Sequence, residues 1–299
     1  MEASLAEDSI LEAGATTTPG AVRLLLKNRV AVATGLVMLG FVAVALFASL
    51  LAPHDPAEQH PEAIRVPPCW HLEGSMRFPL GTDALGRDLL SRILYGARIS
   101  ILLGFVVVLL TLVMGTGLGM LAGYYGGRFD AVMSRVVDTL LAFPFLIFAL
   151  AIMAATGPNL VALVFALAFK GWVDFFRVAR GDVMVARAFE YVLAARGLGA
   201  SNANILFGEI LPNIVPPLIV LATLRMATGI ISEASLSFLG IGVPPSIPAW
   251  GTMVADGRGD IQSAWWIATF PGLAILLLVL AANLFGEGLR DALDPRMRK

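Results

Sequence analysis

The chain has 299 residues, of which 58% are hydrophobic and 14% are charged, and its mean hydropathy is +0.81. Soluble domains have about 45–50% apolar and about 25% charged residues, so this composition excludes an ordinary soluble domain and indicates a membrane protein. The net charge of −1 argues against a nucleic-acid partner, and the single cysteine, Cys69, excludes an internal disulfide framework and a multi-thiolate metal site.

Six apolar stretches predict transmembrane helices, for which about 20 residues suffice. In chain order these spans lie near Val30–Ala52, Ile99–Gly123, Thr139–Ala155, Leu160–Phe176, Ile214–Ser232 and Trp265–Phe285. The third and fourth spans are short, and Gly157-Pro158-Asn159 between them is typical of a tight turn. The expected fold is therefore an all-α membrane protein with six transmembrane helices.

The positions of Lys and Arg predict the orientation, because cytosolic loops carry an excess of both. With the N-terminus inside, most of the 21 Lys and Arg residues are cytosolic, and both termini lie in the cytosol. The first apolar run exceeds the roughly 7–15 residues of a signal-peptide core, so we interpret it as an uncleaved anchor. The chain then divides into a cytosolic tail (1–29), the first transmembrane helix with an extracytoplasmic segment (30–98), a core (99–290) with a cytosolic hairpin (177–212), and a cytosolic tail (291–299).

The extracytoplasmic segment contains charged residues with two interpretations. Asp83, Arg87 and Asp88 either pair internally and fix the loop, or contact a binding protein or gate at the outer mouth. The same segment holds Cys69 and all three histidines, whose spacing matches no standard zinc arrangement. We therefore expect no metal site in this chain.

Glycines and prolines within the spans predict where helices pack closely and where they bend. Gly115, Gly119 and Gly123 recur every four residues in the second span, a spacing that favours close packing of two helices in a membrane. Pro144 in the third span, Pro271 in the sixth and Pro216-Pro217 in the fifth each predict a kink.

Ionisable residues within the spans are candidates for a pathway, because such groups usually face the bundle interior or a water-filled cavity. Arg225 and Glu233 lie eight residues apart, within roughly 80° of each other around a helix, so both could line one polar path. The alternative is that Glu233 reaches the outer interface while Arg225 pairs with a buried partner. Lys170 and Asp174, four residues apart, predict an interfacial ion pair.

The hairpin from Arg177 to Pro212 is the longest cytosolic connection. A first helix is predicted at Glu190–Arg196, ended by Gly197 and Gly199, with Ser201 as the N-cap of a second helix. Leu211-Pro212 is predicted to stop this second helix before the fifth span. The first helix has small residues on its surface and a predicted apolar side made of Phe189, Val192 and Leu193.

The hairpin resembles the cytoplasmic Glu-Ala-Ala loop of binding-protein-dependent ABC importer permeases. In that motif Glu-Ala-Ala is followed after three residues by Gly, and after nine more by Ile-x-Leu-Pro. The residues that match in register are Ala194, Ala195, Gly199, Leu211 and Pro212. Leu193 stands in place of the motif's Glu, and Glu209 in place of its Ile.

Other segments resemble the C-type permease subunit of dipeptide and oligopeptide importers. They are Gly81-Thr82-Asp83, Gly86-Arg87-Asp88, Ser91-Arg92, Gly123-Tyr124-Tyr125-Gly126-Gly127, Ala234-Ser235-Leu236-Ser237-Phe238-Leu239-Gly240, Pro248-Ala249-Trp250-Gly251 and the run from Gly286 to Pro295. The resemblance covers nearly everything after residue 30 and implies the type I ABC importer permease fold in the inner membrane of a bacterium.

The resemblance implies one half of a translocation pathway for peptides or peptide-like solutes. The implied partners are a homologous second permease subunit, two cytosolic ABC ATPases and an extracytoplasmic substrate-binding protein. No nucleotide-binding Gly-x-x-x-x-Gly-Lys-Ser/Thr run occurs, so ATP and Mg are expected on the ATPases, with no cofactor on this chain and no enzymatic activity of its own. The expected ATPase-coupling residues are Glu190, Ala194, Ala195, Arg196, Gly199, Leu211 and Pro212.

Two alternatives stay open from the sequence. A permease of this kind could instead serve a chelated metal such as nickel, since no residue decides the substrate. A stand-alone channel or secondary transporter is the alternative from another class, although we find no inverted pair of interrupted helices that would indicate a transporter.

Overall fold

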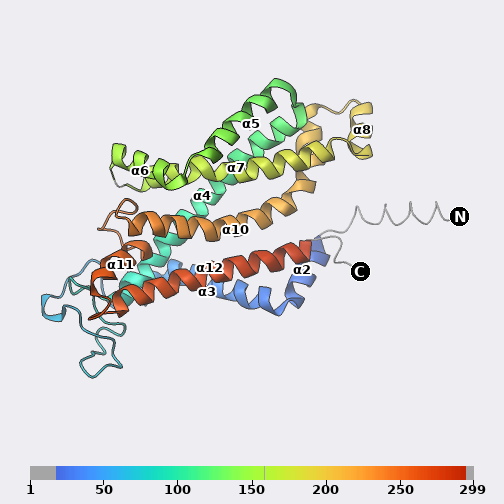
Figure 1. Ribbon diagram of the computed structural model, residues 1–299. Helices are drawn as coiled ribbons and strands as arrows, with labels where there is room; N and C mark the ends of the chain where they lie inside the picture. The colour runs from blue at the N-terminus through green and yellow to red at the C-terminus, as the bar shows by residue number, and fades with distance from the viewer. Residues whose placement is uncertain (1–17, 158, 294–299) are drawn as a thin grey trace.

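The computed structural model describes residues 18–157 and 159–293, and this part of the chain is almost entirely helical (Figure 1). The helices are α2 (Thr18–Lys27), α3 (Arg29–Leu51), α4 (Leu89–Tyr125), α5 (Gly127–Ala142), α6 (Phe145–Thr156), α7 (Leu160–Ala186), α8 (Glu190–Gly197), α9 (Asn202–Asn204), α10 (Leu211–Phe238), α11 (Trp250–Gly257) and α12 (Trp266–Leu293). Short 3-10 turns lie at Pro61–Ala63 and Arg258–Asp260, and a π-helical turn at Ile205–Ile210. The predicted all-α membrane fold is confirmed for these residues.

The number of spans depends on whether the bent helix pair α5–α6 and helix α7 are each counted as one. Four helical segments are long and apolar enough to cross a membrane, namely α3, α4, Asn202–Phe238 and α12, and the bent pair α5–α6 makes a fifth. Helix α7 has 27 residues, or about 40 Å, which exceeds the roughly 30 Å hydrocarbon core. It also carries Lys170, Asp174 and Arg177 and is less apolar than the others. The predicted count of six, which includes α7, therefore stays a prediction.

The path of the chain separates two ends of the bundle. Figure 1 shows α8, α2 and the last turns of α12 at one end, and the long connection between α3 and α4 together with α11 at the other. The hairpin helix thus lies at the same end as α2 and the last turns of α12. The two features that the sequence predicts for opposite sides of the membrane, the hairpin and the segment after the first span, lie at opposite ends.

The helices extend further than the apolar stretches predicted as spans, most clearly at α4 and α7. Helix α4 begins at Leu89, before the predicted span start at Ile99, so the end of the predicted outer segment up to Arg98 is helical. Helix α7 continues to Ala186, beyond the predicted span end at Phe176. Both extensions carry charged residues that a search for apolar runs leaves out.

The third predicted span is not one helix. Its chain is broken after Ala142, and α5 and α6 meet at an angle of 87°. Pro144 is the N-cap of α6, and Phe143 before it is extended, with φ −85° and ψ 131°. A proline lacks the backbone N–H and disfavours helical geometry in the residue before it, so the change of direction is a break where we predicted a kink.

The predicted helix stop at Leu211-Pro212 is also wrong. The chain is helical from Asn202 to Phe238 without interruption. In the π-helical turn the Leu211 N–H donates to the carbonyl of Leu206, five residues back. The wider turn shifts the hydrogen-bond register just before Pro212, which has no N–H to donate.

Helices α4 and α7 pack along the predicted glycine seam. A Cβ atom on Gly115 would lie 2.3 Å from the Trp172 carbonyl oxygen, and one on Gly119 would lie 2.5 Å from that of Phe176. Gly123 repeats the pattern at 2.7 Å from the Arg180 carbonyl oxygen. No side chain fits at these distances, so the prediction of a helix–helix seam is confirmed.

Candidate functional site

Helix α8 is a short, defined element at one end of the bundle. Glu190 lies in its first turn and Arg196 in its last, where each charge is favourable to the helix dipole. The Ala200 N–H donates to the Ala195 carbonyl and the Gly199 N–H to that of Arg196, both at 3.0 Å. This is the Schellman arrangement, and Gly199 supplies the left-handed backbone that it needs, with φ +83°. The predicted helix end at Gly197 and Gly199 is confirmed.

One side of α8 packs against the bundle through two small residues. Val192 is fully buried and Ala195 is partly buried, in a cluster with Ile205, Leu206 and Ile210. Of the expected apolar side of Phe189, Val192 and Leu193, only Val192 packs into the bundle. Phe189 and Leu193 are four residues apart, and are 50% and 52% exposed.

Polar contacts attach the hairpin to the end of α4. The Tyr124 hydroxyl donates to Asn202 Oδ1 at 2.8 Å, and Arg196 Nη2 donates to the same hydroxyl at 3.3 Å. Arg187 Nη1 donates to the Gly123 carbonyl at 3.0 Å, which gives this carbonyl in the last turn of α4 a hydrogen-bond partner. These contacts of Tyr124, Asn202 and Arg187 were not predicted from the sequence, because their partners lie 63 or more residues away.

The rest of the α8 hairpin is exposed and presents both apolar and charged residues. Leu198 is 89% exposed, and Ala194 and Leu193 are also accessible. Of the other predicted coupling residues, Glu190, Arg196 and Gly199 lie on exposed positions of this hairpin. Leu211 and Pro212 lie at the start of α10, beyond the π-helical turn. Burial raises the pKa of the Tyr191 hydroxyl, which accepts a hydrogen bond from Asn213 Nδ2 at 3.4 Å.

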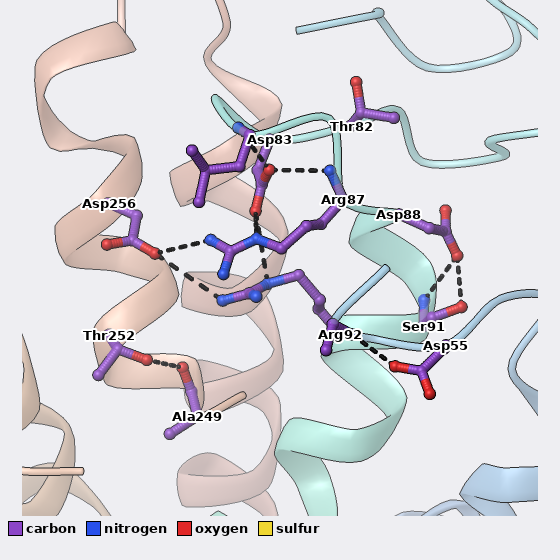
Figure 2. Close-up of polar contacts among 12 residues, drawn as sticks. Asp55, Thr82, Asp83, Arg87, Asp88, Ser91, Arg92, Ala249, Thr252 and Asp256 are labelled. Carbon is purple, nitrogen blue, oxygen red and sulfur yellow. Dashed lines mark hydrogen bonds and ion pairs between the residues drawn. The ribbon is translucent and has the colours of Figure 1, made fainter. Parts of the chain in front are cut away.

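The opposite end of the molecule carries a buried charge cluster, shown in Figure 2. Arg87 Nε donates to Asp83 Oδ2 at 2.6 Å, and Arg92 Nε lies 3.6 Å from the same oxygen. Asp256 of α11 lies 3.6 Å from Arg87 and 3.8 Å from Arg92. Burial raises the pKa of Asp256, and the two arginines oppose that shift. The predicted internal pairing of Asp83 and Arg87 is confirmed.

Asp88 does not join that cluster. Its carboxylate caps α4, accepting hydrogen bonds from the Ser91 N–H at 2.9 Å and the Ser91 hydroxyl at 2.5 Å (Figure 2). The prediction that Asp88 takes part in the same ionic pairing is therefore corrected. An acidic side chain at a helix N-terminus satisfies free N–H groups, which explains its complete burial.

The third predicted site lies between α4, α7 and α10. Arg225 Nη2 of α10 lies 3.1 Å from Asp174 Oδ1 of α7, and both line a cavity of about 250 Å³. Lys170 also lines this cavity, but its Nζ donates to the Phe143 carbonyl at 3.1 Å. The predicted Lys170–Asp174 pair is thus wrong, because the acid pairs across helices with Arg225.

Glu233 lies apart from this cavity. Its carboxyl group is fully buried between α4 and α10, where it accepts from Ser237 at 2.7 Å and from Ser100 at 3.3 Å. Glu233 therefore does not line the cavity that Arg225 lines, and the predicted translocation path that would include both residues stays a prediction.

Comparison with known proteins identifies the family to which this chain belongs. Residues 115–299 match the family model described as "binding-protein-dependent transport system inner membrane component". Residues 19–68 match a second family model, described as the N-terminal transmembrane domain of oligopeptide transport permease C.

Curated relatives match over most of their length. A di/tripeptide transport system permease protein of Pseudomonas aeruginosa is 46% identical over 271 residues, covering 91% of this chain and 89% of that protein. A dipeptide transport system permease protein of Escherichia coli K12 is 45% identical, with coverages of 86% and 85%. A glutathione transport system permease protein of Pectobacterium atrosepticum is 44% identical, with coverages of 92% and 90%. The chain belongs to the family of inner membrane permease components of binding-protein-dependent transport systems.

Proposed function

We propose that this chain is one of two homologous permease subunits of an ATP-driven importer for peptides or peptide-like solutes. The family membership supports the permease role, and the relatives named for di- and tripeptides and for glutathione support the substrate class. A short peptide and glutathione share an amino group, carboxylates and amide bonds. A chelated metal lacks that support among the relatives described above.

The observation that carries the proposal is the exposure of three large apolar side chains in the α8 hairpin. Phe189, Leu193 and Leu198 are all half exposed or more, and exposed apolar residues gathered in one region favour a protein contact. The hairpin that carries them is fixed by buried Val192 and by the Tyr124 contacts. A cytosolic ATPase that binds the exposed surface of this hairpin would transmit its movement to α4 and α10 as to a rigid body.

The sidedness follows from this assignment. The end with α8 faces the cytosol, together with both chain termini, in the inner membrane of a bacterium. The end with the Asp83–Arg87 pair faces outward and contacts the substrate-binding protein. ATP and Mg are held by the two ATPase subunits, and this chain takes no cofactor and catalyses no reaction itself.

Co-purification tests the docking side directly. We compare Leu198→Lys with Leu72→Lys, which places the same charge at a fully exposed leucine of the outer segment. Each variant is tagged, expressed with its native neighbours and purified in mild detergent, and its partners are identified by mass spectrometry. We expect Leu198→Lys to lose the ATPases and keep the second permease, and Leu72→Lys to keep both. Equal retention of the ATPases by the two variants would contradict the proposal.

A further inference from the structure

The cavity between α4, α7 and α10 carries an unusual concentration of charge for the interior of a membrane protein. Its lining includes Lys170, Asp174 and Arg225, and three hydroxyl residues complete its polar side: Thr111, Thr228 and Ser232. All of these lie within predicted spans. Ionisable groups at such positions are costly and usually mark the route of a substrate or ion.

The charges in the cavity do not balance. Arg225 and Asp174 make one contact of 3.1 Å, with side chains 38% and 33% exposed, so both are accessible from the cavity. Within residues 18–157 and 159–293, Lys170 has no acidic group at ion-pair distance and donates only to the Phe143 carbonyl. A guanidinium has five N–H donors and an ammonium three, so most donors remain available. The excess positive charge and these donors suit a carboxylate.

The hydroxyl groups add acceptors. Thr111 donates to the Val107 carbonyl at 2.8 Å, and Ser232 donates to the Thr228 carbonyl at 2.8 Å. Thr228 donates to the Arg225 carbonyl at 3.1 Å. Since each hydroxyl proton is used within its own helix, the oxygens remain as acceptors for an incoming N–H group. The cavity thus complements a molecule that has both a carboxylate and an amino or amide group.

We propose that this cavity is a transient site for the C-terminal carboxylate of a peptide in transit, which Arg225 and Lys170 hold and for which Asp174 is the exchangeable counterion. The proposal rests on the function proposed above. Ligand pockets usually measure about 300–1,000 Å³, so a cavity of about 250 Å³ accommodates one end of a peptide. The remainder would contact the second permease subunit.

Ion exchange gives such a site the weak affinity that transport needs. When the substrate carboxylate displaces Asp174 from Arg225, one ion pair replaces another and the net gain is small. A site in a pathway must bind well enough to be entered and weakly enough to be left. Asp174 then lowers the affinity of the cavity for the substrate carboxylate, whereas Arg225 provides that affinity.

These opposite roles distinguish a binding site from a structural ion pair. We measure binding of L-alanyl-L-alanine, and of its C-terminal amide, to the complete complex without binding protein, using saturation-transfer NMR. Arg225→Gln should weaken binding of the free acid about tenfold or more, as expected for a charge-assisted hydrogen bond, and remove the preference over the amide. Asp174→Asn should tighten binding of the free acid. Arg177→Gln is the matched control, because Arg177 is exposed on the same helix outside the cavity, and it should change nothing.

A purely structural pair would respond differently. Equal weakening by Arg225→Gln and Asp174→Asn, or no binding to the wild-type complex, would overturn the proposal. If Arg225→Gln fails to assemble, Lys170→Met replaces it, and unchanged affinity in that variant would also overturn the proposal. ATP-dependent uptake by wild-type proteoliposomes with binding protein is measured in parallel. Uptake without these affinity changes would contradict only the site, whereas absence of uptake would contradict the transport function.

Discussion

Two glycines at the end of α8 allow one backbone conformation to be tested almost in isolation. A Cβ atom on Gly197 or on Gly199 would meet no other atom within 4 Å, so neither position is restricted by packing. Gly199 has φ +83°, whereas Gly197 is the last residue of the helix itself and has no positive φ. Replacing each by alanine therefore changes the backbone preference and little else.

The expected effects have opposite signs. Alanine in the left-handed region costs about 1–2 kcal/mol, partly offset by the smaller entropy of the unfolded chain, so Gly199→Ala should destabilise the hairpin by about 1 kcal/mol. Alanine at Gly197 should stabilise the helix by about 0.5–1 kcal/mol. The two variants then differ by about 1.5–2 kcal/mol, or roughly 10–30-fold in the local opening equilibrium.

Hydrogen exchange in the purified complex measures that difference. We follow peptides spanning residues 190–201, which contain the Gly199 and Ala200 amides of the Schellman arrangement. Gly199→Ala should exchange faster than the wild type and transport less substrate per ATP, and Gly197→Ala should exchange more slowly. Faster exchange in both variants, or an unchanged exchange rate in both, would refute the assignment of Gly199 to the helix end.

Two further matched pairs test packing and attachment. Gly119→Leu should prevent folding and membrane accumulation, because a Cβ there would lie 2.5 Å from the Phe176 carbonyl, whereas Gly117→Leu, with open space around it, should accumulate normally by immunoblot. Normal accumulation of both would contradict the seam. Tyr124→Phe removes the 2.8 Å hydrogen bond to Asn202 and should cost about 1 kcal/mol and reduce transport per ATP, while Tyr125→Phe, 57% exposed, should leave both unchanged. Identical transport per ATP in the two tyrosine variants would argue against the attachment.

Local signals in the sequence predicted local structure well. The four-residue spacing of glycines predicted the α4–α7 seam, because small residues at that spacing occupy one face of a helix. The Gly197-Leu198-Gly199 run and Ser201 predicted where α8 ends and where the next helix begins, and the Ser201 side chain accepts from the Asn204 N–H as an N-cap does. Each of these features depends on residues within one or two helical turns.

Features that depend on distant partners were not predictable in the same way. Lys170 and Asp174 have the spacing of a local ion pair, yet Asp174 pairs with Arg225 on another helix. The α5–α6 break was expected at Pro144 as a kink, since the sequence does not give the angle that packing of α6 against α7 selects. Leu211-Pro212 resembled a stop because a π-helical turn is not visible in the residue pattern.

The central claim is that this permease moves its substrate only when partner ATPases hydrolyse ATP. The most direct test reconstitutes the purified complex into liposomes with binding protein and labelled L-alanyl-L-alanine on the outer-segment side and ATP on the α8 side. Our account predicts accumulation of the dipeptide that requires both ATP and the ATPase subunits. Equal uptake without ATP, or by this chain alone, would contradict the account and indicate a channel or secondary transporter.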